Sequence, residues 1–131
     1  MAKLDLVILK KKFAICQLSP KDSIPDPSNL GDFWSITKTD DEISLIVPEN
    51  KIPHVNCKTE KSWRAIKIIG PLYFSLTGII ATLSTALAKA GISIFAFSTY
   101  NTDYVLVKEK NVEQSIEVLE KSGHKIIELH Q

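Results

Sequence analysis

The order of apolar runs and turn residues in the second half of the chain most constrains its fold. A mostly apolar, β-branched run at residues 65–69 is stopped by Gly70 and Pro71, which predicts a strand. From Leu76 to Ala90, apolar residues recur at helical spacing and end at Gly91. This spacing predicts an amphipathic helix with a glycine stop.

The remaining segments complete a regular pattern. Residues 92–98 and 104–107 are β-rich and flank a polar stretch, which predicts a hairpin. Asn111 followed by Gln114 resembles a capping box that opens a second helix, and a last strand is expected from 125 to 129. The order from about Trp63 onward is βαββαβ, an α+β, ferredoxin-like arrangement with two helices on one face of an antiparallel sheet.

The first half repeats part of this pattern. The run 14–20 aligns with 65–71, and 33–46 aligns with 94–107 at a larger offset. The first copy therefore lacks the residues of the long helix, and its prolines exclude a full crossover helix. We expect two tandem domains packed as one body: a reduced one at 1–61 and a complete one at 62–131.

Three smaller features complete the architecture. Residues 4–9 predict an extra strand that pairs along a sheet edge, and the lysines at 10–12 favour a solvated turn. Cys16 lies in an apolar run and Cys57 in a polar connector. This usage indicates two unrelated, reduced thiols rather than a disulfide framework.

The charge balance argues against a polyanionic partner. Sixteen Lys+Arg oppose fifteen Asp+Glu, for a formal net charge of +1, so no broad field attracts nucleic acid. No apolar run has the length of a membrane span, and the N-terminus does not resemble a signal peptide. We therefore expect no membrane association and a cytoplasmic location.

No pattern of catalytic residues is convincing. His54 and Cys57 have the spacing of a metal pair but lack further ligands nearby, and Cys16 has no recognisable base. Phe95 and Phe97 alternate on a strand without basic neighbours, which favours packing over base stacking. We expect a protein that is not an enzyme and needs no metal or cofactor.

Two segments are candidates for ligand binding. The segment 70–79 leads into a helix whose first turn offers free N–H donors to a carboxylate, and Gly78 permits close approach. The polar turn 98–103 carries Asp103, which suits an ammonium group. Together they would fit an α-amino acid. An ordinary helix cap and an ordinary hairpin turn remain open as alternatives.

The strings 70–79, 87–95 and 98–104 resemble the ACT domains of the cytosolic arginine sensor (CASTOR-like) group, and small bacterial tandem-ACT proteins are similar. The resemblance also covers 13–20 and 33–48. It implies tandem βαββαβ ACT domains, no catalysis, and an amino acid held at an ACT–ACT interface. The loop carries Leu76 in place of an acidic residue, which argues against selection of a cationic side chain such as arginine.

The resemblance also implies the residues of the site. From the loop these are Tyr73, Phe74, Ser75, Thr77, Gly78 and Ile79; from the second strand and its turn, Thr99, Tyr100 and Asp103; from the reduced domain, Ser35, Ile36 and Thr37. Two ACT units, against four in eukaryotic members, imply a homodimer.

Three hypotheses follow, in this order. The first is a regulatory sensor that binds a free amino acid and changes its association with a regulated partner. The second is a structural interaction module with no ligand. The third is a small enzyme that uses Cys16 or His54.

Overall fold

The chain divides into two units in the computed structural model, which describes residues 3–69 and 78–130. One unit is Lys11–Trp63, and the other combines Met1–Lys10 with Arg64–Gln131. The smaller unit ends at Trp63, whereas the sequence predicts a domain boundary between residues 61 and 62. The first ten residues, however, belong with the second half of the chain.

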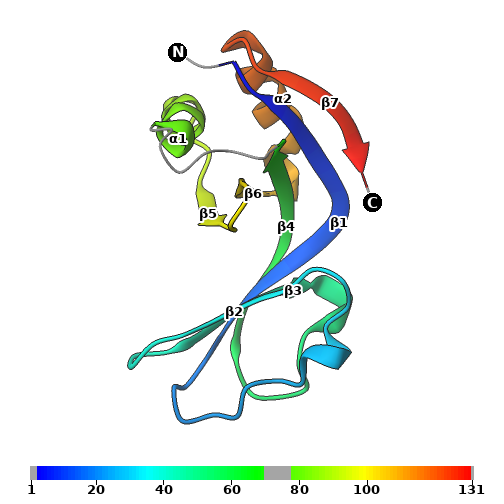
Figure 1. The fold of residues 1–131 in the computed structure, drawn as a ribbon, viewed down its shortest axis with the longest axis vertical. Helices are drawn as coiled ribbons and strands as arrows, with labels where there is room; N and C mark the ends of the chain where they lie inside the picture. Colours follow the sequence, from blue (N-terminus) through cyan, green and yellow to red (C-terminus); the bar gives the residue numbers. More distant parts are fainter. Residues whose placement is uncertain (1–2, 70–77, 131) are drawn as a thin grey trace. The chain divides into compact units, whose positions relative to one another are not determined.

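The larger unit contains the expected succession of strands and helices (Figure 1). These elements are β4 (Lys58–Ile68), α1 (Ile79–Lys89), β5 (Ile94–Ser98), β6 (Asp103–Lys108), α2 (Val112–Lys121) and β7 (Lys125–His130). The hairpin pairs Ile94 with Val107 and Ser98 with Asp103. The α+β, ferredoxin-like βαββαβ fold is confirmed.

The first part of β1 (Asp5–Leu18) is an additional strand of this unit. It pairs in parallel with β7, from Asp5 opposite Lys125 to Leu9 opposite His130. On its other side it neighbours β4, where the Ile69 N–H donates to the Asp5 carbonyl at 2.9 Å. The edge position expected for residues 4–9 is wrong, because this segment lies between β7 and β4.

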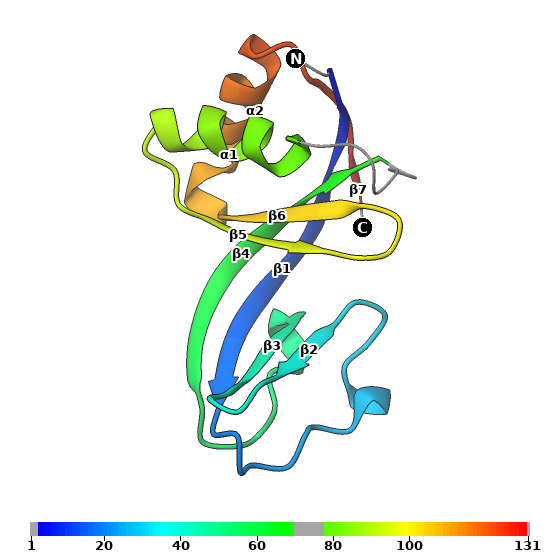
Figure 2. The same cartoon turned by 60° about the vertical axis from the view of Figure 1, so that its left-hand side comes forward.

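Both helices of the larger unit cover one face of its sheet (Figure 2). Their apolar stripes meet strand side chains in a single buried cluster, which includes Leu6 and Ile8 from β1, Ile66 and Ile68 from β4, Leu83 and Leu87 from α1, and Leu119 from α2. The apolar residues of the two predicted stripes that the structure describes lie in this cluster or pack, partly buried, against it.

Each helix ends with the same pair of backbone hydrogen bonds, and the end of α1 illustrates it. At α1 the Ile92 N–H donates to the Leu87 carbonyl and the Gly91 N–H to the Ala88 carbonyl, with Gly91 at φ 75°. This is a Schellman motif, and it confirms Gly91 as the stop.

The capping box expected at the start of α2 is wrong. The Asn111 side chain makes no cap bond. Ser115 Oγ donates to the Asn111 carbonyl at 2.7 Å.

The smaller unit is built on the second part of β1. Residues Phe13–Leu18 pair with β3 (Ile43–Pro48), and β3 pairs with β2 (Ser35–Lys38). Single 3₁₀ turns, η1 (Pro27–Asn29) and η2 (Glu49–Lys51), stand in the two connections where the larger unit has helices. Its own core gathers Ala14, Cys16, Leu18, Leu30, Ile43, Leu45 and Val47.

The lysines at 10–12 lie inside β1, so the turn expected there is wrong. All three are exposed. Consecutive polar side chains can follow one another in a strand where neither face of the strand is covered. The apolar pattern of β1 is therefore interrupted at these lysines although the chain does not turn.

Candidate functional site

The expected ligand loop joins the end of β4 to the start of α1. Tyr73, Phe74, Ser75 and Thr77 lie outside the described residues. Gly78 and Ile79 are described: Gly78 is the N-cap at φ 78° without a side-chain cap bond, and its carbonyl accepts from the Thr82 N–H at 2.8 Å. No atom of the described residues lies within 4 Å of a Cβ placed on Gly78, and its positive φ is the feature that favours glycine there.

The turn between β5 and β6 is held by its own polar groups. The Thr99 N–H and Oγ1 donate to the Thr102 carbonyl at 2.8 and 3.2 Å. Ser98 Oγ donates to Asp103 Oδ1. This contact orients a half-exposed carboxylate and uses one of its acceptor positions.

Thr102 anchors this turn to the strand that leads into the loop. Its side chain is 6% exposed, and Oγ1 donates to the Ile68 carbonyl at the end of β4. The turn, the end of β4 and the first turn of α1 lie at the same end of the sheet (Figure 2). The sequence does not predict this role of Thr102, because its partner is a backbone carbonyl distant in sequence.

The remaining candidates belong to different units. Tyr100 is 81% exposed at the tip of the β5–β6 turn. Ser35, Ile36 and Thr37 lie on β2 in the other unit, where Ile36 packs against that unit's core. Because strand side chains alternate, Ser35 and Thr37 point to the opposite face from Ile36. The proposed contribution of these residues to one pocket stays a prediction.

The expected packing role of the strand aromatics is confirmed for Phe97. Its ring stacks on Tyr104 across the hairpin, with centroids 5.1 Å apart and an interplanar angle of 5°. This contact covers a face that a base-stacking platform would need to leave open.

Cys16, one of the two residues of the enzyme hypothesis, lies in the core of the smaller unit. Cys16 is 1% exposed, and burial raises the pKa of its thiol, which disfavours the nucleophilic thiolate. Among the described residues, no group of three or more His, Cys, Asp or Glu side chains is placed to hold a metal ion.

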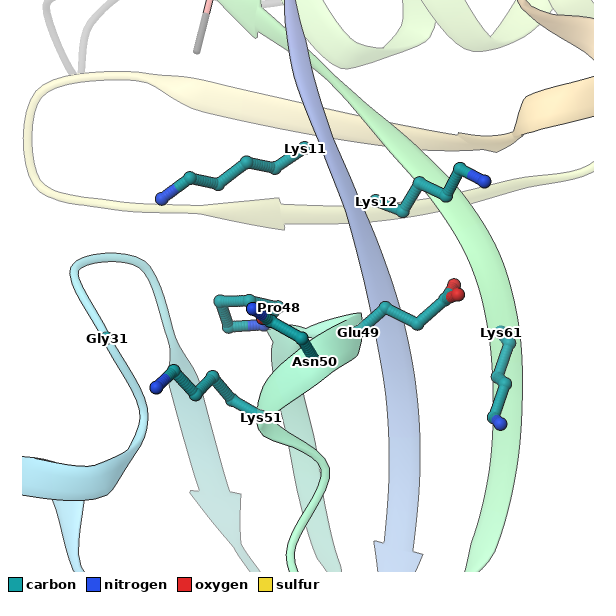
Figure 3. Close-up of a pocket in the computed structure, with 8 residues that line it drawn as sticks. All are labelled: Lys11, Lys12, Gly31, Pro48, Glu49, Asn50, Lys51 and Lys61. Atoms are coloured by element: carbon teal, nitrogen blue, oxygen red, sulfur yellow. The ribbon is translucent and has the colours of Figure 1, made fainter.

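A basic hollow in the smaller unit was not expected from the sequence. It has a volume of about 480 Å³ and is lined by Lys11, Lys12, Gly31, Pro48, Glu49, Asn50, Lys51 and Lys61. In Figure 3 the Glu49 carboxylate lies between Lys12 and Lys61, whereas Lys11 and Lys51 extend toward the segment of Gly31. The lysines come from separate segments of the sequence, so no local motif predicts this hollow. Its charge suits an anion.

Glu49 also holds an unusual stretch of backbone beside this hollow. Its Oε2 accepts from the Ser62 N–H at 2.8 Å. Ser62 has φ 64° and is the one non-glycine residue with a positive φ in the described part of the chain. A side chain at this φ carries a backbone cost, which the hydrogen bond to Glu49 helps to offset.

A family model for the ACT domain matches residues 58–121, the segment from β4 to α2. A solved structure from Agobacterium tumefaciens is 33% identical, covers 100% of this chain and 97% of that one, and superimposes with a TM-score of 0.90. The chain belongs to the ACT-domain family. A second model, described as an N-terminal domain, matches residues 11–55 of this ACT-domain protein.

Among curated proteins, the human cytosolic arginine sensor for mTORC1 subunit 1 is 35% identical over 106 residues, which are 76% of this chain and 32% of the sensor. This ACT-domain protein therefore spans about a third of the length of the arginine-sensor relatives it matches. The aspartokinase α and β subunit structure, at 19% identity and a TM-score of 0.66, covers 93% of this chain and 99% of that one and shares the fold. Neither helix described in this ACT-domain protein is long and apolar enough to cross a membrane.

Proposed function

We propose that this ACT-domain protein is a non-catalytic regulatory sensor that binds a free amino acid at an interface between ACT units. The observation that carries the proposal is the anchored turn at 98–103. Thr102 ties it to the end of β4, and Ser98 orients the Asp103 carboxylate. A carboxylate held in this way is preorganised for an ammonium group.

The opposite end of an amino acid needs hydrogen-bond donors. The first turn of α1 begins at Gly78, and no side chain of the described residues caps it. The first N–H groups of a helix have no partner within the helix and carry the positive end of its dipole. An α-carboxylate suits this position. In the proposed site, Asp103 holds the amino group of the ligand, and Thr99 and Tyr100 are further contacts. The loop residues that would wrap the ligand are Tyr73, Phe74, Ser75, Thr77, Gly78 and Ile79, and the candidates from the reduced domain are Ser35, Ile36 and Thr37.

The biological setting is part of the proposal. The relatives named as arginine sensors are three times longer than the stretch they share with this chain, and Leu76 replaces an acidic residue in the loop. We therefore propose an amino acid without a cationic side chain as the ligand. A homodimer would supply the additional ACT units. Binding of the amino acid would change the association with a regulated partner protein in the cytoplasm.

A thermal-shift screen of the full chain against the proteinogenic amino acids tests this function. A ligand at one hundred times its dissociation constant stabilises the folded state by about 2.7 kcal/mol, so at least one amino acid should raise the melting temperature by several degrees. Asp103→Asn should abolish that shift. Asp41→Asn, the same change in the β2–β3 turn, is the matched control and should keep it.

Two results would count against the sensor. If no amino acid raises the melting temperature, the ligand class is wrong. If a shift occurs but survives Asp103→Asn undiminished, the binding site lies elsewhere. A dimer that is insensitive to every amino acid would favour the structural interaction module.

A further inference from the structure

Two cysteines that are distant in sequence meet at one hydroxyl group in the smaller unit. Cys16 lies in β1, and Cys57 directly precedes β4. Thr59 Oγ1 donates to Cys16 Sγ at 3.8 Å and lies 3.4 Å from Cys57 Sγ. Because a hydroxyl has one hydrogen, donation to Cys16 leaves the Cys57 thiol as donor to Thr59. The three groups form a chain from Cys57 through Thr59 to Cys16.

We propose that Cys16 and Cys57 are an oxidisable thiol pair that forms a reversible intramolecular disulfide. The proposal goes beyond the sensor function and does not depend on it. Both thiols are free in this structure, and Cys57 packs against the apolar cluster that contains Cys16. The two sulfur atoms thus lie on the same side of β1 and face the same oxygen.

The backbone can supply the remaining approach of the sulfur atoms. A disulfide needs Cα atoms roughly 4.4–6.8 Å apart and converging Cβ vectors. Cys16 is fixed within a paired strand, opposite Leu45 of β3. Residues 52–57 belong to no helix or strand, so Cys57 is the partner that adjusts without breaking a strand ladder.

The two thiols have different roles in the oxidation. Cys57 is half-buried, whereas Cys16 is 1% exposed, so a peroxide reaches Cys57 first. The Cys57 sulfur attacks a peroxide oxygen and the O–O bond breaks, which gives a sulfenic acid and one water from hydrogen peroxide. The Cys16 sulfur then attacks the Cys57 sulfur. The S–O bond breaks, and the hydroxide takes the Cys16 proton and leaves as a second water.

This sequence of steps balances and fits the environment of Cys16. Two thiols lose two hydrogens and two electrons, and one hydrogen peroxide is reduced to two waters. Burial raises the pKa of Cys16, while the Thr59 hydrogen bond favours its thiolate. Cys16 is therefore a poor first target but is held ready beside the sulfur that it must attack.

The bridge would fix a segment that borders a cavity. Residues Ile52, Pro53, His54 and Val55 of the connector line a hollow of about 550 Å³, together with Ile24 and Leu30. A Cys16–Cys57 bond ties the end of this connector to β1. Oxidation thus restrains one wall of the hollow.

Mass spectrometry of the full chain tests the pair directly. The reduced protein is treated with hydrogen peroxide at a small molar excess, and its intact mass, free thiols and cross-linked peptides are measured without reductant. Because the chain has two cysteines, an intramolecular bridge removes both thiols and two hydrogens and leaves the protein monomeric on a denaturing gel. Dithiothreitol should restore both thiols.

Single variants separate the two roles. Cys16→Ser should stop at a Cys57 sulfenic acid that dimedone traps, and Cys57→Ser should leave Cys16 at least about tenfold slower to react than Cys57. Should Cys16→Ser fail to fold, peptide mapping of the unmutated chain still identifies the bridge. Oxidation that yields only overoxidised Cys57, or only disulfide-linked dimers, would overturn the proposal.

Discussion

At the scale of single residues, His124 links the start of the chain to the end of α2. Its side chain is 4% exposed, and Nδ1 accepts the Leu4 N–H at 3.2 Å. An accepting Nδ1 carries no proton, so this contact requires the neutral ring. Burial, with a smaller contribution from the Lys3 charge, lowers the pKa of His124 from its ordinary value of 6.5.

The His124 environment predicts a loss of stability in mild acid. Because the folded pKa is depressed, the unfolded chain binds more protons below pH 6.5, and the free energy of unfolding falls as the pH drops from 6.5 toward the lowered value. Urea midpoints at pH 7.5 and 5.5 measure the effect. His124→Gln should flatten this dependence, whereas the exposed His54→Gln should retain it; equal slopes in both variants would contradict the assignment.

Thr102 is the residue on which the position of the β5–β6 turn depends. Thr102→Val keeps the shape of the side chain but removes the donor to the buried end of β4. We expect a loss of about 1–3 kcal/mol, because the Ile68 carbonyl is left without this partner. Urea unfolding measures it, with Thr37→Val at an exposed strand position as control. A loss no larger than in the control would show that the turn is held without Thr102.

At the scale of elements, the sequence predicts what is encoded locally. The helical spacing and the glycine that takes a positive φ identify α1 from its own residues, and the hairpin follows from alternating runs around a polar turn. The place of β1 between β7 and β4 was not predictable, because strand pairing joins residues more than a hundred positions apart. The meeting of Cys16 with Cys57 and the anchor at Thr102 depend on the same long-range contacts.

The inserted strand makes the larger unit dependent on the start of the chain. Leu4, Leu6 and Ile8 belong to its buried cluster, although residues 58–131 alone contain the whole βαββαβ order. We expect a 58–131 fragment to be unfolded or aggregated by circular dichroism, because an open edge and an incomplete core remain. Joining residues 1–10 to its C-terminus through a flexible linker should restore the helical signal. A folded, monomeric fragment without them would contradict this role.

At the scale of the whole molecule, two continuous strands supply residues to both units. β1 contributes Asp5–Leu9 to the pairing with β7 and Phe13–Leu18 to the pairing with β3. β4 likewise begins in the smaller unit and ends in the larger one. When either unit unfolds, half of each shared strand loses its neighbours, which destabilises the half that remains.

The chain carries separate natural probes for this coupling. Its two tryptophans, Trp34 and Trp63, lie in the smaller unit, whereas α1 and α2 lie in the larger one. Tryptophan fluorescence and far-ultraviolet circular dichroism therefore report on different units. Because of the shared strands, we expect the two urea transitions to coincide in midpoint and slope, as a single cooperative step requires. Trp34→Phe leaves Trp63 on β4 as the one tryptophan and should give the same midpoint. A fluorescence transition well below the circular dichroism transition would mean that the smaller unit unfolds alone, and that the strands do not couple the two units.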